Sequence, residues 1–147
     1  MRFAQLSAGV ALIAVVPSLS AQSNSITLTS LGTLTISVAT PGGQPVSSTN
    51  NTGKYSVNAV SGRMKVTAQL DSPLPSGVTL TITLSAPSGA VSLGATALST
   101  SSQNVVRYIP VGDYTNLSVN LQLSSSVTAG VVPPNTSHIT LTLVDDP

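Results

Sequence analysis

The sequence contains no cysteine, no tryptophan and no glutamate. Without cysteine, the chain has neither disulfides nor thiolate metal ligands. Only 6% of its residues are charged, against roughly 25% in ordinary soluble domains. Ser, Thr, Asn and Gln must therefore form most of the surface, which repels copies of itself only weakly. With a formal net charge of +1, the chain also lacks the basic footprint of a nucleic-acid-binding protein.

Residues 1–21 are predicted to form a signal peptide. Arg2 is followed by an apolar stretch over residues 8–16, then by Pro17 and by small residues up to Ala21. This order of features is typical of a cleaved leader. The apolar stretch is too short to span a bilayer core of about 30 Å, so a leader is favoured over a membrane anchor. We expect a secreted protein at or beyond the cell surface, without a membrane span after removal of the leader.

Beyond the leader, apolar residues alternate with Thr, Ser, Asn and Gln in short runs. Clear examples cover residues 55–59, 64–70, 78–84, 117–123 and 139–143. A period of two predicts half-buried β-strands. Segments rich in Pro, Gly and Asn separate the runs, at residues 41–43, 51–53, 61–62, 73–77, 87–89, 110–113 and 133–135. Residues 46–147 are therefore predicted to form one all-β domain, an immunoglobulin-like or Greek-key β-sandwich of about seven to nine strands.

Residues capable of acid–base chemistry are few. His138 is the sole histidine, and it directly precedes the last predicted strand. Asp145 and Asp146 are adjacent, so in a strand their side chains face opposite ways. Asp71 and Asp113 lie beside Pro or Gly, where a carboxylate usually binds the backbone of a turn. The sequence predicts no enzyme, no cofactor and no metal site, and a secreted hydrolase using His138 is the weakest alternative.

A binding surface is a second alternative, because exposed tyrosines often contact carbohydrate or protein ligands. Tyr55 continues the apolar face of its run and is predicted to lie in the core. Tyr108, Asp113 and Tyr114 are the candidate ligand edge of a carbohydrate-binding or adhesion module. Tyr114 has a second interpretation, in which its hydroxyl fastens a corner of the sandwich.

Three asparagines, Asn50, Asn116 and Asn135, lie in N-x-Ser/Thr patterns. In a chain this rich in Ser, Thr and Asn, such matches arise by chance, and they matter only in a host that glycosylates asparagine.

The alternating stretch over residues 25–38 is longer than the others, with Leu31 as its one clear apolar residue out of phase. Residues 22–45 are predicted to form an N-terminal strand and a tether. Such a strand pairs with its own sheet or adds to the open edge of a neighbouring molecule. Head-to-tail repetition of strand addition gives an open filament. The predicted polymerisation strand has its face at Ile26, Leu28, Gly32, Leu34, Ile36 and Val38.

Two segments resemble small secreted bacterial proteins of the pilin-like kind. Residues 61–71, SGRMKVTAQLD, are followed by PSGVTL at 75–80. Residues 121–132, LQLSSSVTAGVV, are followed by SHITLTL at 137–143. The resemblance is to spore-coat-U-type proteins, chaperone–usher pilins and a related, poorly characterised secreted family. It implies a pilin-like β-sandwich whose partner is its own copy, with a periplasmic chaperone and an outer-membrane usher as further candidate partners. The resemblance carries no catalytic residue.

These observations favour a structural subunit of an extracellular filament, pilus or surface coat, assembled by addition of the N-terminal strand to a neighbouring subunit.

Overall fold

The computed structural model describes residues 22–29, 31–36, 43–129 and 136–147. The predicted leader, Val38 and Asn135 lie outside the described residues. Within these ranges, nine β-strands and one short 3-10 helix, η1, account for the regular structure. Their bounds are β1 Ser25–Leu28, β2 Ser48–Ala59, β3 Met64–Leu70, β4 Val78–Leu84, β5 Val91–Ser92, β6 Thr96–Ala97, β7 Gln103–Ile109, β8 Gly112–Ser125, η1 Val127–Ala129 and β9 Ile139–Asp145.

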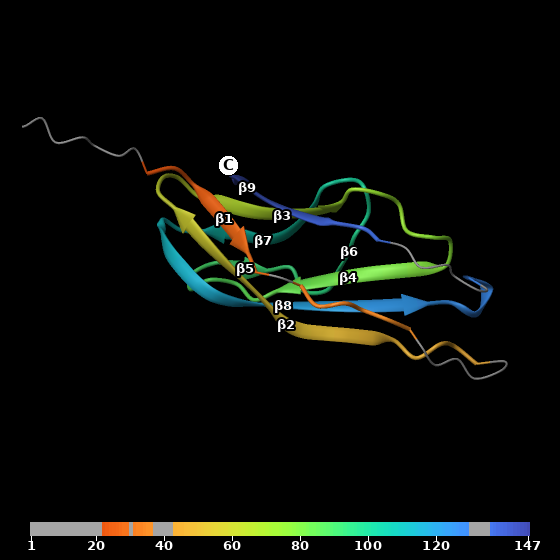
Figure 1. Ribbon diagram of the computed structural model, residues 1–147. Coiled ribbons are helices and arrows are strands. Elements are labelled where there is room, and N and C mark those ends of the chain that lie inside the picture. Colours follow the sequence, from red (N-terminus) through yellow and green to blue (C-terminus); the bar gives the residue numbers. More distant parts are fainter. Residues whose placement is uncertain (1–21, 30, 37–42, 130–135) are drawn as a thin grey trace, which may run out of the picture.

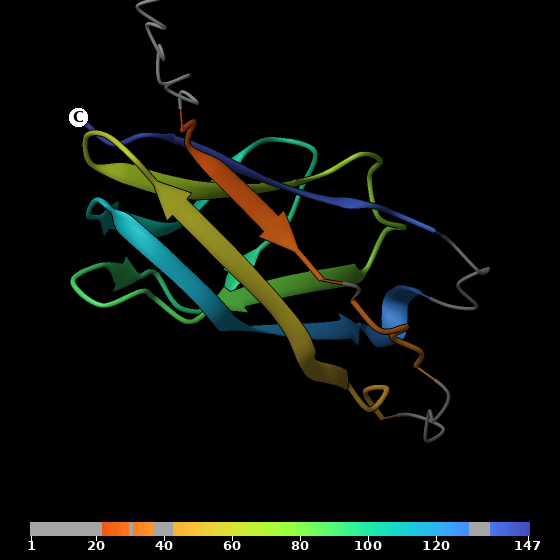
Figure 2. The same cartoon turned by 60° about the vertical axis from the view of Figure 1, so that its left-hand side comes forward.

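The strands form two antiparallel sheets that pack face to face (Figure 1). One sheet has the order β1-β2-β8-β4-β6, and the other has the order β5-β7-β3-β9. The predicted all-β class is therefore confirmed. Two edge strands, β1 of the first sheet and β9 of the second, lie on the same side of the molecule and contact each other. They run close together near the C-terminus and diverge toward the other end (Figures 1 and 2).

The core lies between the sheets and is built from the alternating positions of the central strands. In β4, for example, Leu80, Ile82 and Leu84 are buried while the threonines between them are not. Burial of these side chains is the main stabilising term of the fold, at about 1.5–3 kcal/mol for each large one. The core residues are Tyr55, Val57, Ala59, Met64, Val66, Ala68, Leu70, Leu80, Ile82, Leu84, Leu98, Val105, Val106, Ile109, Val119 and Leu121.

Tyr55 lies in this core as predicted. Its hydroxyl donates a hydrogen bond of 2.5 Å to the carbonyl oxygen of Ser85. Burial raises the pKa of Tyr55 far above its ordinary value of 10.0, so the hydroxyl remains a donor. The polar end of this large side chain is thus satisfied inside the core.

One predicted turn is wrong. Residues 51–53 do not separate two strands but lie within β2, where the pairing with β8 shifts register between Asn50 and Gly53. This irregularity is a β-bulge, and glycine is common at bulges as well as at turns. Asn50 closes the bulge, because its side-chain oxygen accepts hydrogen bonds from the amide and the hydroxyl of Thr52, at 3.0 and 2.9 Å.

The N-terminal strand is also shorter than predicted. β1 ends at Leu28, and residues 31–36 have no strand structure. The next residue, Thr29, explains the end of β1. Its amide and hydroxyl both donate to the carbonyl oxygen of Lys54, at 2.9 and 2.6 Å, and the hydroxyl also accepts from the amide of Lys54. The Thr29 hydroxyl thus accepts the Lys54 amide, which would bind a backbone carbonyl if the strand continued.

Candidate functional site

The candidate site is the side of the sandwich where β1 and β9 form the two edges. Among the described residues, β1 pairs only with β2, in antiparallel register from Ser25 opposite Asn58 to Leu28 opposite Tyr55. Apolar side chains that are only half-buried gather along this side and pack against the core. They are Ile26, Leu28, Leu31, Leu34, Ile139, Leu141 and Leu143.

The segment after β1 is held by side chains rather than by backbone pairing. In the part of the chain that the structure describes, residues 31–36 form no backbone hydrogen bond with another residue. Leu31 instead lies over Gly53, which is buried in β2. A Cβ added to Gly53 would lie 2.6 Å from Cδ2 of Leu31 and 3.1 Å from Cβ of Val119. The absence of a side chain at Gly53 therefore creates the space that Leu31 fills.

Gly32 makes the second contact of this segment. A Cβ at Gly32 would meet the side-chain amide of Asn50, so a larger residue at this position would require the Asn50 side chain to shift away from the segment. Asn50, one of the three candidate glycosylation sites, is therefore packed against its own chain. Asn116 is exposed, at a left-handed backbone position with φ of 59°.

The predicted polymerisation face is brought together only in part. Ile26, Leu28 and Leu34 pack against the core. Gly32 is exposed and Ile36 is half-buried outside any strand. Leu31 is out of phase with the alternation, yet its side chain packs over Gly53 of β2. This is because the strand has already ended before Thr29.

β9 is held at both ends by a carboxylate. At its start, Oδ1 of Asp71 accepts the main-chain amide of His138 at 2.8 Å, and the amide of Asp71 donates to the carbonyl of His138 at 3.1 Å. The hydrogen bond from His138 lowers the pKa of Asp71 below its ordinary value of 3.8. Asp71 thus fastens β9 to the end of β3, and its role is more than that of the turn cap predicted for it.

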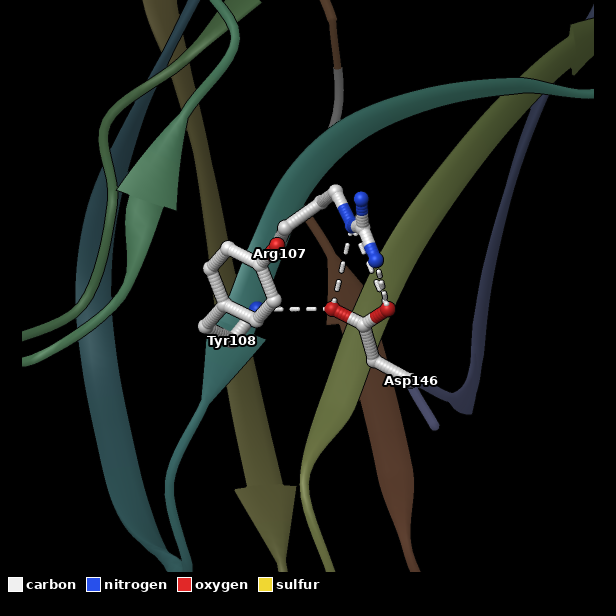
Figure 3. A network of polar contacts seen from close by, with 3 residues as sticks. All are labelled: Arg107, Tyr108 and Asp146. Atoms are coloured by element: carbon white, nitrogen blue, oxygen red, sulfur yellow. Dashed lines mark hydrogen bonds and ion pairs between the residues drawn. The ribbon is translucent and has the colours of Figure 1, made fainter.

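At the other end of β9, Asp146 lies at the centre of a network that Figure 3 shows. Its carboxylate accepts from Nη2 of Arg107 at 2.5 Å and from Nε at 3.2 Å, and Oδ2 also accepts from the amide of Tyr108 at 3.0 Å. The hydrogen bonds from Arg107 are the main reason that the pKa of Asp146 is lowered from 3.8. The amide of Asp146 donates to the carbonyl of Arg63 at 2.8 Å. The side chain of Asp146 is fully buried, while Asp145 is exposed.

The three residues of the predicted ligand edge, Tyr108, Asp113 and Tyr114, do not form one surface site. Tyr114 is half-buried, and its hydroxyl donates to the carbonyl of Pro110 at 3.3 Å, which is the corner-fastening role considered for it. Asp113 is exposed within β8, opposite Asn58, and is not in a turn. Tyr108 lies in a shallow depression whose lining includes neither Asp113 nor Tyr114.

The acid–base residues do not form a metal site among the described residues, where no three of them gather. His138 is exposed, and the contact that joins it to Asp71 uses its main chain. The contacts of the described residues include no hydrogen bond to its imidazole. Across the described ranges, no helix is long and apolar enough to cross a bilayer.

Sequence reasoning missed two pairs that hold this side of the molecule, Leu31 with Gly53 and Arg107 with Asp146. The first had a signal in the one apolar residue that breaks the alternation. The second had none, because the partners are 39 residues apart and nothing local in the sequence joins them.

No protein-family model, curated protein or solved structure matches this chain. The function is therefore argued from its own residues.

Proposed function

We propose that this protein is a secreted structural subunit of an extracellular filament, pilus or surface coat, with an immunoglobulin-like, pilin-like β-sandwich. Its partner is a second copy of itself, and residues 22–36 of one copy replace those of the next. A periplasmic chaperone and an outer-membrane usher are candidate assembly partners. The observation that carries the proposal is the short attachment of this segment, which has four residues of strand pairing and one further backbone hydrogen bond at Thr29, after which the described residues 31–36 are held by side-chain contacts.

The free energy that holds the segment is small. Its four leucine and isoleucine contacts with the core are half-buried, so each contributes roughly 1 kcal/mol, half of the value for full burial. These apolar contacts sum to about 4 kcal/mol, and the hydrogen bonds of β1, Thr29 and Asn24 add to them. The detached form is therefore a minor species, which is the form that exchange requires.

Strand exchange must displace β1 from its own chain. Only Gln22, Ser23 and Asn24 stand between the predicted cleavage site and β1, so no further strand remains to be donated. In a neighbouring copy, the exchanged segment makes the same contacts that it makes within its own chain, including Leu31 over Gly53. Exchange of an identical element is a low-cost route to assembly, and a head-to-tail arrangement leaves the chain of copies open.

The surface composition supports dense packing of the copies. Charged residues make up 6% of the sequence, so long-range repulsion between copies is small. Two edges that carry half-buried apolar residues lie on the same side of the molecule, where an incoming strand would add.

A disulfide that locks β1 to β2 tests the proposal. Thr27 and Ser56 are register partners, which places their Cβ atoms within about 4.5–5.5 Å. The chain has no cysteine of its own, so oxidation of the Thr27→Cys/Ser56→Cys protein at high dilution, before assembly, joins β1 to β2 of the same chain. In protein lacking residues 1–21, we expect filaments by electron microscopy for the unmodified and the reduced double variant, and monomers for the oxidised variant.

The matched control is Thr83→Cys/Asn120→Cys, which joins the register partners of β4 and β8 and should leave assembly intact when oxidised. Deletion of residues 25–38 is a second way to remove the donor and should also give monomers. Filaments from the oxidised β1 lock, or an unmodified protein that stays monomeric at every concentration, would refute the proposal.

A further inference from the structure

A strained tyrosine at a bulge in β7 points to a second site. Tyr108 has a left-handed backbone, with φ of 62°. Bulky side chains rarely adopt this conformation, which costs about 1–3 kcal/mol and usually requires glycine. Asn116, at the equivalent φ of 59° in β8, belongs to a residue type that tolerates it. The left-handed backbone at Tyr108 therefore needs an explanation, whereas the one at Asn116 does not.

The bulge that contains Tyr108 is held in place by the Asp146 network. Between Met64 opposite Ile109 and Val66 opposite Val106, β7 has one residue more than β3. Bulges of this kind redirect side chains and are common beside functional sites. The hydrogen bond from the Tyr108 amide to Asp146 fixes the unusual peptide (Figure 3). The network thus maintains a conformation that the residue type disfavours.

The consequence is that the Tyr108 ring lies at the surface instead of in the core. Tyr108 is 38% exposed and borders an open depression of about 570 Å³, which is large enough for a small ligand. The depression is lined by Gly62, Arg63, Gly89, Tyr108, Pro110 and Val111.

The polar groups of this depression have unused capacity. The guanidinium of Arg63 lies over the Tyr108 ring, 5.0 Å from its centroid. Arg107 is neutralised by Asp146, but Arg63 has no ion pair with any described residue. Neither the Arg63 side chain nor the Tyr108 hydroxyl forms a hydrogen bond within the described part of the chain. Val111, which is 58% exposed, adds an apolar surface beside them.

We propose that this depression, with Arg63, Tyr108 and Val111, binds a carboxylate-bearing saccharide such as a uronic acid unit. The planar guanidinium of Arg63 matches a carboxylate with two parallel hydrogen bonds. The Tyr108 hydroxyl pairs with sugar hydroxyls, and Val111 packs against the apolar face of the sugar ring. Asp146 is a positioning residue that holds Tyr108 in place. Gly62 and Arg63 of this site lie in the turn that joins β2 to β3.

The test is titration calorimetry with a galacturonic acid trimer and with the galactose trimer of the same linkage, which lacks the carboxylates. We expect binding of the acidic trimer only. Arg63→Gln should weaken it at least about tenfold, since a charge-assisted pair is lost. Asp113→Asn, at an exposed carboxylate outside the lining of the depression, should leave binding unchanged.

Tyr108→Gly separates a binding role from a structural one. Glycine adopts the left-handed backbone without strain, so this variant should keep or raise the melting temperature and yet lose binding. Equal binding of both trimers, binding of acetate or an acidic peptide as tight as that of the acidic trimer, or no binding at all would overturn the proposal. Undiminished binding by Tyr108→Gly would overturn the assignment of the tyrosine.

Discussion

The two edge strands on the open side of the sandwich, β1 and β9, differ in how they are attached. β9 pairs with β3 over its whole length and has a carboxylate clamp at each end, from Asp71 and from Asp146. β1 has four residues, and the side chain of Asn24 accepts the Val60 amide at its start. Thr29 then ends the pairing. β9 is therefore attached by more contacts than β1, and β1 is the strand that we propose to exchange.

Acid should give the largest loss of stability, because protonation of Asp71 and Asp146 weakens the hydrogen bonds at both ends of β9 together. The pKa values of Asp71 and Asp146 are lower in the folded chain than the ordinary 3.8. Their stabilisation is thus complete above about pH 4 and is lost as the pH falls through the lowered values. Urea unfolding between pH 6 and pH 2 should show this loss of stability.

The Asp146→Asn variant should be less stable at neutral pH and should show a smaller acid dependence. Asp113→Asn, at an exposed carboxylate without a hydrogen bond to the described residues, is the control and should behave like the unmodified protein. An unchanged pH dependence in Asp146→Asn would show that the clamp contributes nothing.

Truncation of one apolar residue on each edge strand compares the two directly. Leu141→Ala in β9 should lower the free energy of unfolding by about 2 kcal/mol, at the lower end of the range for leucine because the side chain is half-buried. Ile26→Ala in β1 should lower it by less than about 1 kcal/mol, since β1 detaches before the core unfolds. Chemical denaturation measures both, and equal losses would mean that both strands belong to one cooperative unit.

Gly53→Ala should loosen the N-terminal segment by blocking the position of Leu31. The new Cβ meets Leu31 and Val119, and we expect a loss of about 1–2 kcal/mol from overpacking. Hydrogen exchange should rise in β1 and remain low in β9. The double variant Gly53→Ala/Leu31→Ala removes the nearer collision and should recover part of the loss, whereas a further additive loss would argue against the contact.

Thr29→Val should have the smallest effect. It removes the hydroxyl that bonds Lys54 but keeps the shape of the side chain and the hydrogen bond from the amide. We expect a loss of about 0.5–1 kcal/mol, with faster amide exchange at Lys54. Valine has no hydroxyl to accept a hydrogen bond from the Lys54 amide. Slower exchange at this amide would therefore contradict the role assigned to Thr29.

The all-β class and most of the core could be predicted from the sequence, because alternation with a period of two fixes which side chains face inward. Ile82 and Val119 are buried where that pattern puts them. The pattern fails at bulges, where one extra residue reverses the phase. In β7, both Val105 and Val106 are buried for this reason, and Arg107 is redirected to Asp146.

The candidate site was less predictable. The sequence drew attention to the N-terminal stretch, and Ile26 and Leu28 do lie at an edge of the sheet. It could not show that Thr29 stops the strand, because that depends on Lys54, which is 25 residues away. Tyr108 and Tyr114 are close in sequence but have different roles, since only the bulge and the Asp146 network expose Tyr108.

The most direct test of the central claim is a cross-link between two chains. One protein carries Thr27→Cys alone and the other Ser56→Cys alone, and the two are mixed, allowed to assemble and oxidised. If β1 of one copy pairs with β2 of another, non-reducing electrophoresis shows a two-chain product joined at these register partners. The same experiment with Thr83→Cys and Asn120→Cys proteins should give none. Assembled material that yields no Thr27–Ser56 product would contradict strand exchange.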